Sequence, residues 1–183
     1  MQTMGIIFSN IYDDKMGALT EVRTAASIPV GGRYRQIDFI LSNMANSGIK
    51  HIGIITKYNY QSLMDHLGSC QEWDLNLNKN GVTLLPPYST GHNGVYRGKL
   101  EALQNALPVL EDSNQEYVVL SDSNVMAAVD FRKVVAAHIA SGADVTVVAK
   151  QGIANGTKPI HFAVLPDADG IATAMGCNYV ASP

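Results

Sequence analysis

Short apolar runs alternate with amphipathic segments along most of the chain. The runs are rich in isoleucine, valine and leucine and are bounded by polar residues or glycine, which is typical of strands buried in a parallel sheet. They occupy residues 4–8, 49–56, 82–85, 117–120 and 145–149. Apolar residues recur with helical periodicity at residues 37–45, 60–67, 99–110 and 131–139. This alternation predicts an α/β domain with a mostly parallel sheet flanked by helices.

Local signals predict where several elements begin and end. Gly31 and Gly32 tolerate positive φ, so they predict a sharp corner between an extended segment and the first helix, which Gly48 should end. Asn59 is expected to cap the second helix, and Gly68 lies just past the end of that helix.

The second half of the chain carries further patterns. Leucines at positions 100, 103, 107 and 110 form one helical stripe, which we expect to lie in the core. His138 shares an apolar helix face and is interpreted as a half-buried structural histidine rather than a ligand. Residues 161–165 and 171–173 flank the sequence Asp-Ala-Asp-Gly and predict a hairpin.

Composition narrows the class of protein. A chain of 183 residues, 46% hydrophobic and 16% charged, is long enough for one globular domain and does not suggest two. The net charge of −3, without any lysine or arginine run, argues against nucleic acid as a partner. Cys70 and Cys177 are widely spaced, as expected of free thiols in a reducing compartment. No apolar run has the length of a membrane span and no signal-peptide pattern is present, so we expect a cytoplasmic protein without a membrane partner.

The ligand crevice of a parallel α/β sheet lies beyond the carboxyl ends of its strands. The candidate site loops are therefore residues 9–17, 86–98 and 121–126. The first of these loops carries no G-x-G-x-x-G, which disfavours a dinucleotide-binding dehydrogenase.

The run Gly-Gly-Arg-Tyr-Arg-Gln-Ile-Asp-Phe-Ile-Leu-Ser-Asn-Met-Ala-Asn-Ser-Gly at residues 31–48 resembles a signature of glucose-1-phosphate adenylyltransferases, also called ADP-glucose pyrophosphorylases. The resemblance extends over nearly the whole chain and implies the Rossmann-like fold of nucleotide-diphospho-sugar transferases. By this resemblance, the chain corresponds to the N-terminal part of that family's nucleotide-binding domain. On this basis we expect residues 1–183 to form a single, incomplete domain without the family's C-terminal β-helix.

The first loop departs from the family at its phosphate-binding positions. By the resemblance, glycines are expected where this chain has Asn10, Ile11 and Asp13, and an arginine where it has Lys15. A phosphate cradle needs glycine because its backbone approaches the anion closely, often at positive φ. A carboxylate about 4 Å from a phosphate charge costs about 4 kcal/mol at an effective dielectric of 20. The sequence thus predicts poor triphosphate binding in the usual pose.

Other catalytic positions of the family have also changed. Ser123 stands where the resemblance places the aspartate that binds Mg²⁺, and Asp122 is a weak substitute because adjacent side chains of a strand point to opposite sides. Tyr88 replaces a glutamine expected near the base, and Ala25 replaces a lysine. Gly98 matches, in Tyr-Arg-Gly, but the Thr-Ala-Asp-Ala that follows in the family does not. We therefore predict no catalytic residue and no cofactor of this chain's own, although the family uses Mg²⁺.

The basic residues around the glycine corner allow two interpretations. Arg33 and Arg35 are either solvated at a helix start or, with Arg23 and Lys15, form a candidate anion site for a phosphorylated metabolite.

The positions that differ from the family are mainly those that the resemblance assigns to phosphate binding and catalysis, whereas the positions of the structural scaffold match. This distribution resembles the accessory, D-type subunit of bacterial ADP-glucose pyrophosphorylase and implies a catalytic subunit as partner, in a homo- or hetero-oligomer that acts in glycogen biosynthesis. Two alternatives stay open: an active nucleotidyltransferase with a rearranged phosphate loop, and a non-catalytic structural or ligand-sensing domain.

Overall fold

The computed structural model describes residues 2–76, 81–87, 96–150 and 160–179. The chain forms two compact units, residues 1–137 and 138–183. Among the helices of the described residues, none combines the length and the apolar character that crossing a membrane requires.

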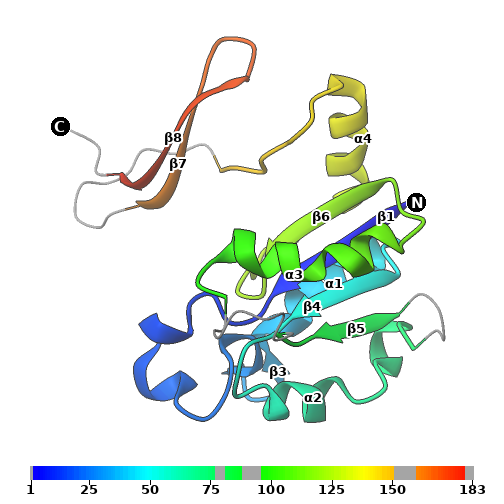
Figure 1. Ribbon diagram of the computed structural model, residues 1–183, viewed down its shortest axis with the longest axis vertical. Helices are drawn as coiled ribbons and strands as arrows, with labels where there is room; N and C mark the ends of the chain where they lie inside the picture. Colours follow the sequence, from blue (N-terminus) through cyan, green and yellow to red (C-terminus); the bar gives the residue numbers. More distant parts are fainter. Residues whose placement is uncertain (1, 77–80, 88–95, 151–159, 180–183) are drawn as a thin grey trace. The chain divides into compact units, whose positions relative to one another are not determined.

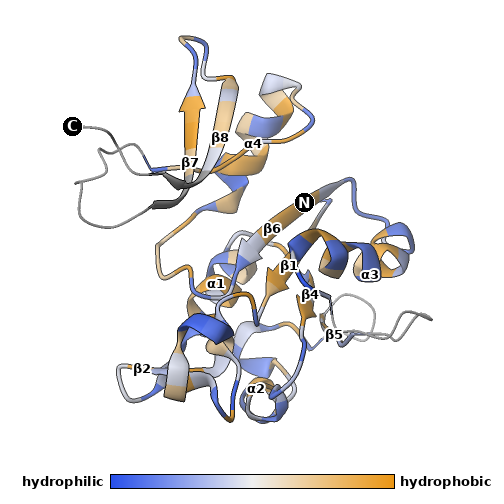
Figure 2. Ribbon diagram, turned by 60° about the vertical axis from the view of Figure 1, so that its left-hand side comes forward, coloured by the Kyte–Doolittle hydropathy of each residue, from blue (hydrophilic) through white to orange (hydrophobic). Residues whose placement is uncertain are grey.

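A four-stranded parallel sheet is the centre of the first unit (Figure 1). Its strand order is β5-β4-β1-β6. The strands are β1 (Thr3–Phe8), β4 (His51–Ile55), β5 (Val82–Leu85) and β6 (Tyr117–Asp122). β1 and β4 are buried almost throughout, and Figure 2 shows their hydrophobic character at the centre of this unit. The predicted α/β fold with a parallel sheet is confirmed.

Helices cover both faces of this sheet. The helices are α1 (Gln36–Asn46), α2 (Gln61–Leu67), α3 (Lys99–Glu111) and α4 (Phe131–Ser141). Residues of α1, α2 and the start of α4 share one core cluster with Ile7 and Ile54. Ala102 and Ala106 of α3 pack on the opposite face, against Met4, Ile6 and Phe8 of β1.

The glycine corner is a small hairpin rather than a direct turn into the helix. β2 (Pro29–Val30) pairs antiparallel with β3 (Tyr34–Arg35), and Gly31 and Gly32 between them have φ of +60° and +77°. α1 follows at once and ends before Gly48, whose φ is +80°. Positive φ at both corner glycines and the helix end at Gly48 confirm these predictions.

Short 3₁₀ turns complete the first unit. They are η1 (Asp13–Lys15), η2 (Gly17–Thr20), η3 (Ala25–Ser27) and η4 (Gln71–Trp73). The N-cap residue of α2 is Tyr60, one residue later than expected. Asn59 precedes the helix and has φ of +55°.

The leucine stripe of α3 is only partly in the core. Ala102 and Ala106 face the sheet, so the leucines lie to one side of the buried direction, and Leu100 is 72% exposed. The expectation that the whole stripe is core is therefore wrong.

The second unit contains one hairpin, β7 (Ile160–Pro166) paired antiparallel with β8 (Ala172–Tyr179). The predicted hairpin is confirmed, with Gly170 in its turn at φ of +80°. The predicted strand at residues 145–149 is wrong. No strand among the described residues pairs with it, and an apolar run without a hydrogen-bonding neighbour does not form a strand.

Candidate functional site

The predicted crevice begins where three parallel strands end side by side. Ser9 follows β1, and its backbone N–H and hydroxyl both donate to the carbonyl of Ile55 at the end of β4, at 3.1 and 2.8 Å. The N–H of Ser123, just past β6, donates to the carbonyl of Phe8 at 3.1 Å. The first and third candidate loops therefore start from the same edge of the sheet.

Asn10 ties the first loop to the segment after β4. Its Oδ1 accepts hydrogen bonds from the N–H of Lys57 at 2.9 Å and from the hydroxyl of Ser9 at 2.6 Å. Its Nδ2 donates to the carbonyl of Tyr58 at 3.2 Å and to the carboxylate of Asp13. The side chain of Asn10, where the resemblance leads us to expect a glycine, is thus occupied by contacts within the protein.

Asp13 forms hydrogen bonds that hold the first loop in a closed conformation. Only 6% of the residue is exposed, and its Oδ1 accepts a hydrogen bond from the buried N–H of Ala25 at 2.8 Å. Its backbone carbonyl accepts one from the hydroxyl of Thr20 at 2.7 Å. Burial raises the pKa of the Asp13 carboxyl, against the opposite effect of the bonds from Ala25 and Asn10.

The sequence led us to expect that the Asp13 carboxylate would repel a bound phosphate, but the structure shows a different effect. The Asp13 carboxylate points into the protein rather than toward a phosphate, and it takes up the donors that it meets. Of the described residues other than glycine, only Asn59, Cys70 and Asp74 have positive φ, so Asn10, Ile11 and Asp13 do not adopt the backbone of a glycine cradle.

The side chains of Ile11 and Lys15 also contact other residues of the protein. Ile11 is half-buried and packs against the core cluster beneath α3. Lys15 is exposed at the end of η1, with its ammonium 5.8 Å from the ring centroid of Tyr12. The positive charge at the family's arginine position lies over an aromatic ring of its own loop.

Asp122 is bound by a cation that the protein itself supplies. The ammonium of Lys99, at the start of α3, lies 2.7 Å from its Oδ1 and 2.8 Å from its Oδ2. The hydroxyl of Tyr12 donates to Oδ2 at 3.3 Å, and burial together with the Asp122 charge raises the pKa of that phenol. Lys99 and Asp122 both lie in segments that differ from the pattern the resemblance implies. These two differences were the sequence signal for the ion pair, although no local pattern joins residues so far apart along the chain.

The residues present do not fit a magnesium ion. Mg²⁺ in nucleotidyl transfer is held by carboxylates together with substrate phosphates. Ser123, at the family's metal position, offers one neutral hydroxyl and is 3% exposed, and the Asp122 carboxylate is already neutralised by Lys99. The described residues contain no group of three histidine, cysteine or acidic side chains that could hold a metal ion.

The second candidate loop is described only at its two ends, residues 86–87 and 96–98. Tyr88 lies outside the described residues. The hydroxyl of Tyr96 donates to the carbonyl of Thr56, and burial raises the pKa of its phenol. Gly98 has an extended backbone and is the N-cap of α3, where its carbonyl accepts from the N–H of Ala102 at 3.0 Å.

The candidate anion residues are not brought together as a set. The guanidinium of Arg35 donates to the carbonyl and hydroxyl of Ser62, both at 2.6 Å. Asp38 lies in the first turn of α1 and accepts from the N–H of Arg35 at 2.9 Å, which places a negative charge at the helix start. Arg33 lines a pocket over α1 to which neither Arg23 nor Lys15 belongs.

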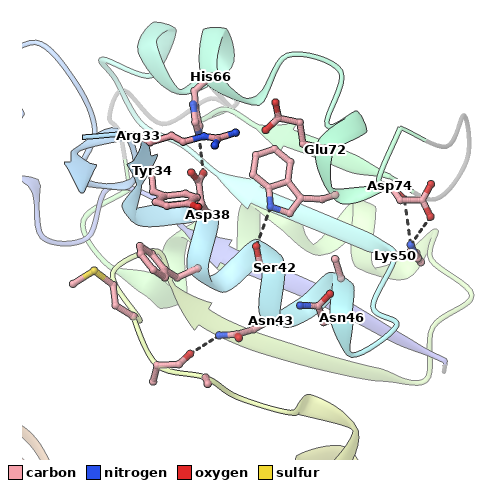
Figure 3. Close-up of a pocket in the computed structure, with 16 residues that line it drawn as sticks. Arg33, Tyr34, Asp38, Ser42, Asn43, Asn46, Lys50, His66, Glu72 and Asp74 are labelled. Carbon is pink, nitrogen blue, oxygen red and sulfur yellow. Dashed lines mark hydrogen bonds and ion pairs between the residues drawn. The ribbon is translucent and has the colours of Figure 1, made fainter. Parts of the chain in front are cut away.

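That pocket, called here the α1 pocket, has a volume of about 770 Å³ (Figure 3). Side chains from β3, α1, the end of α2, η4 and the loop after β6 line it. Within it the imidazole of His66 lies 2.6 Å from Asp38, and Lys50 lies 2.9 Å from Asp74.

Comparison with known proteins identifies relatives over most of the chain. A sequence model described as nucleotidyl transferase matches residues 6–156. The Bacillus subtilis (strain 168) protein named glycogen biosynthesis protein GlgD is 38% identical over 151 residues, which is 82% of this chain and 44% of that protein. Its namesake from Geobacillus stearothermophilus is 38% identical over 81% of this chain and 44% of its own length.

A glucose-1-phosphate adenylyltransferase from Pseudothermotoga lettingae is 35% identical over 80% of this chain and 35% of its own length. The chain therefore spans less than half the length of these three relatives.

Proposed function

Because this chain belongs to the nucleotidyl transferase family, we propose that it is a catalytically impaired, regulatory counterpart of glucose-1-phosphate adenylyltransferase in glycogen biosynthesis. The reaction it would regulate joins ATP and glucose 1-phosphate into ADP-glucose and pyrophosphate. Relatives named for glycogen biosynthesis and relatives named as the adenylyltransferase support the pathway.

The closed first loop is the observation that carries the proposal of impaired catalysis. A phosphate cradle needs backbone N–H groups that are free to meet the anion. Within the loop, the N–H groups of Asp13, Lys15 and Met16 already donate to backbone carbonyls. The side chains of Asn10 and Asp13 also hold the loop to the N–H groups of Lys57 and Ala25, so a triphosphate would have to displace internal bonds. Loss of two such bonds costs about 2–4 kcal/mol before any contact with the ligand is gained.

The metal position supports the same conclusion. The transferred phosphate needs a divalent cation against its charge, and the carboxylate nearest to the family's metal position is paired with Lys99.

The proposed role requires a partner. We propose a catalytic adenylyltransferase subunit, in a hetero-oligomer in the cytoplasm, and a phosphorylated metabolite as a regulator of that assembly. Arg23, Arg33 and Arg35 do not form one anion site for it, because Arg35 is bound to Ser62 and Arg33 lines the α1 pocket without Arg23.

Turnover and assembly together test the proposed function. The purified chain is assayed with ATP, glucose 1-phosphate and Mg²⁺, alone and mixed with the catalytic adenylyltransferase of the same organism, which alone serves as the positive control. We expect no turnover from the chain alone, a heavier species by light scattering in the mixture, and a changed response of the mixture to phosphorylated metabolites. Absence of a mixed species would remove the regulatory role.

The relatives named adenylyltransferase favour a second candidate, an active nucleotidyltransferase with a rearranged loop. The retained Tyr96-Arg97-Gly98 is consistent with it. Turnover by the chain alone within tenfold of a common kcat of about 10 s⁻¹ would establish this candidate. A stable chain with neither turnover nor partner would instead match a ligand-sensing domain.

A further inference from the structure

We propose that the α1 pocket binds a neutral oligosaccharide. Of its residues only Met126, at the end of the third candidate loop, falls within the candidate nucleotide loops, so the inference goes beyond the proposed function. It rests on the aromatic rings of the pocket, on the polar side chains left free there, and on the balance of their charges.

The aromatic part of the pocket is held in place. Trp73 is the chain's one tryptophan, and its indole N–H donates to the hydroxyl of Ser42 at 3.2 Å. The ring of His66 meets the indole edge to face, at 6.2 Å between centroids. Tyr34 is 52% exposed and lies 6.2 Å from Phe39, centroid to centroid. Rigid rings that combine an apolar face with a polar group suit the C–H faces and hydroxyls of a sugar.

Besides the hydroxyl of Tyr34, three polar side chains of the pocket make no hydrogen bond or ion pair within the described residues: the guanidinium of Arg33, the amide of Asn46 and the carboxylate of Glu72. Figure 3 shows Arg33 and Glu72 on the same side of the pocket as His66, and Asn46 farther along α1. A guanidinium only donates, a carboxylate only accepts, and an amide does both. Hydroxyl groups, which donate and accept, can be paired by this set.

The charges favour a neutral ligand over an ion. The other charged groups of the pocket are already paired, Lys50 with Asp74 and His66 with Asp38. Arg33 and Glu72 remain, and they have opposite signs. A phosphate would meet the carboxylate of Glu72, and a cation would meet Arg33. The volume of about 770 Å³ lies within the range of small-molecule sites and is sufficient for more than one sugar ring.

The position of Trp73 makes the proposal directly measurable. Tryptophan fluorescence, excited selectively over that of the 8 tyrosines, reports on this pocket, because Trp73 is the only tryptophan of the chain. Maltotriose and cellotriose are titrated separately; only the choice of an α-linked glucose oligomer rests on the proposed function. We expect a saturable fluorescence change with at least one of the two, unchanged between low and high salt because the ligand carries no charge.

Variants studied by calorimetry locate the binding. Glu72→Gln removes the negative charge that strengthens hydrogen bonds from hydroxyls, and Asn46→Ala removes the hydrogen bonds of the amide. Each should weaken affinity about threefold to tenfold. Trp73→Ala removes the main aromatic face and should weaken it by about tenfold or more. Tyr58→Ala, which removes an exposed aromatic residue outside the pocket, is the matched control and should leave affinity unchanged.

Three results would overturn the proposal: no saturable change with either sugar, a change produced by inorganic phosphate and suppressed by salt, or equal affinity in Glu72→Gln and wild type. A tryptophan signal that depends on protein concentration without sugar would instead identify a contact between copies. None of these results affects the turnover and partner assays, so the two proposals fail separately.

Discussion

Replacing Asp13 by alanine should destabilise the first loop by a predictable amount. The change removes the acceptor of the buried Ala25 N–H, at 2.8 Å, and of the Asn10 amide. A hydrogen bond to a charged group contributes about 1.5–3 kcal/mol, and a buried donor left without a partner costs about 1–3 kcal/mol. Part of this is offset, because burial of the carboxylate is itself unfavourable, as its raised pKa indicates. We expect a net loss of about 2–3 kcal/mol in the free energy of unfolding.

Urea and thermal unfolding measure this loss. For a chain of this length each kcal/mol lowers the Tm by about 2–4 °C, so the Tm of Asp13→Ala should fall by about 4–12 °C. Asp14→Ala, which changes the exposed neighbouring carboxylate, is the control and should stay within about 0.5 kcal/mol of wild type. Equal stability of Asp13→Ala and wild type would show that the loop does not depend on this carboxylate and would refute the reasoning.

The same variant has a defined pH dependence. Since burial raises the folded-state pKa of Asp13 above its usual value of 3.8, this group favours folding below that value, and the contribution is lost as pH rises through the folded pKa. The alanine variant lacks this contribution. The difference in unfolding free energy between wild type and Asp13→Ala should therefore be larger at pH 3 than at pH 7, and the opposite trend would contradict the direction of the shift.

Four further substitutions test separate features of the structure. Lys99→Met removes the cation paired with Asp122 and should cost about 1 kcal/mol in urea unfolding, less at high salt. Gly53→Ala places a Cβ 2.8 and 2.9 Å from two core side chains and should lose about 1–3 kcal/mol of unfolding free energy. Arg35→Ala should lower the Tm because it removes the hydrogen bonds to Ser62, whereas Arg33→Ala, which breaks no bond within the described residues, should leave the Tm unchanged.

The sheet was predictable because buried parallel strands carry an unmistakable pattern. β1 and β4 are continuous apolar runs, and every residue of β1 is buried. The same pattern failed at residues 145–149, where Val145 is 79% exposed, because a local sequence does not specify whether a neighbouring strand is present. For α3, helical periodicity located the helix but not the direction of its buried face, which the small side chains of Ala102 and Ala106 determine.

For the candidate site, the sequence predicted which positions differ from the family but not the contacts that their side chains make. The sequence located Asn10, Asp13 and Ser123 at the edge of the sheet, and the structure places them there. The bond between Asp13 and Ala25 and the ion pair between Lys99 and Asp122 join residues 12 and 23 positions apart. No local pattern links such partners, because the backbone path of an irregular loop decides which donor reaches which acceptor.

Titration of the chain with Mg²⁺ and ATP, followed by nuclear magnetic resonance of the backbone amides, tests the closed loop most directly. If Asn10 and Asp13 hold the loop shut, the amide signals of Asn10, Ile11 and Asp13 should show no saturable shift up to about 1 mM ATP. Saturable shifts at these amides, with a Kd in the micromolar range, would contradict the account and would mean that this loop still cradles a triphosphate.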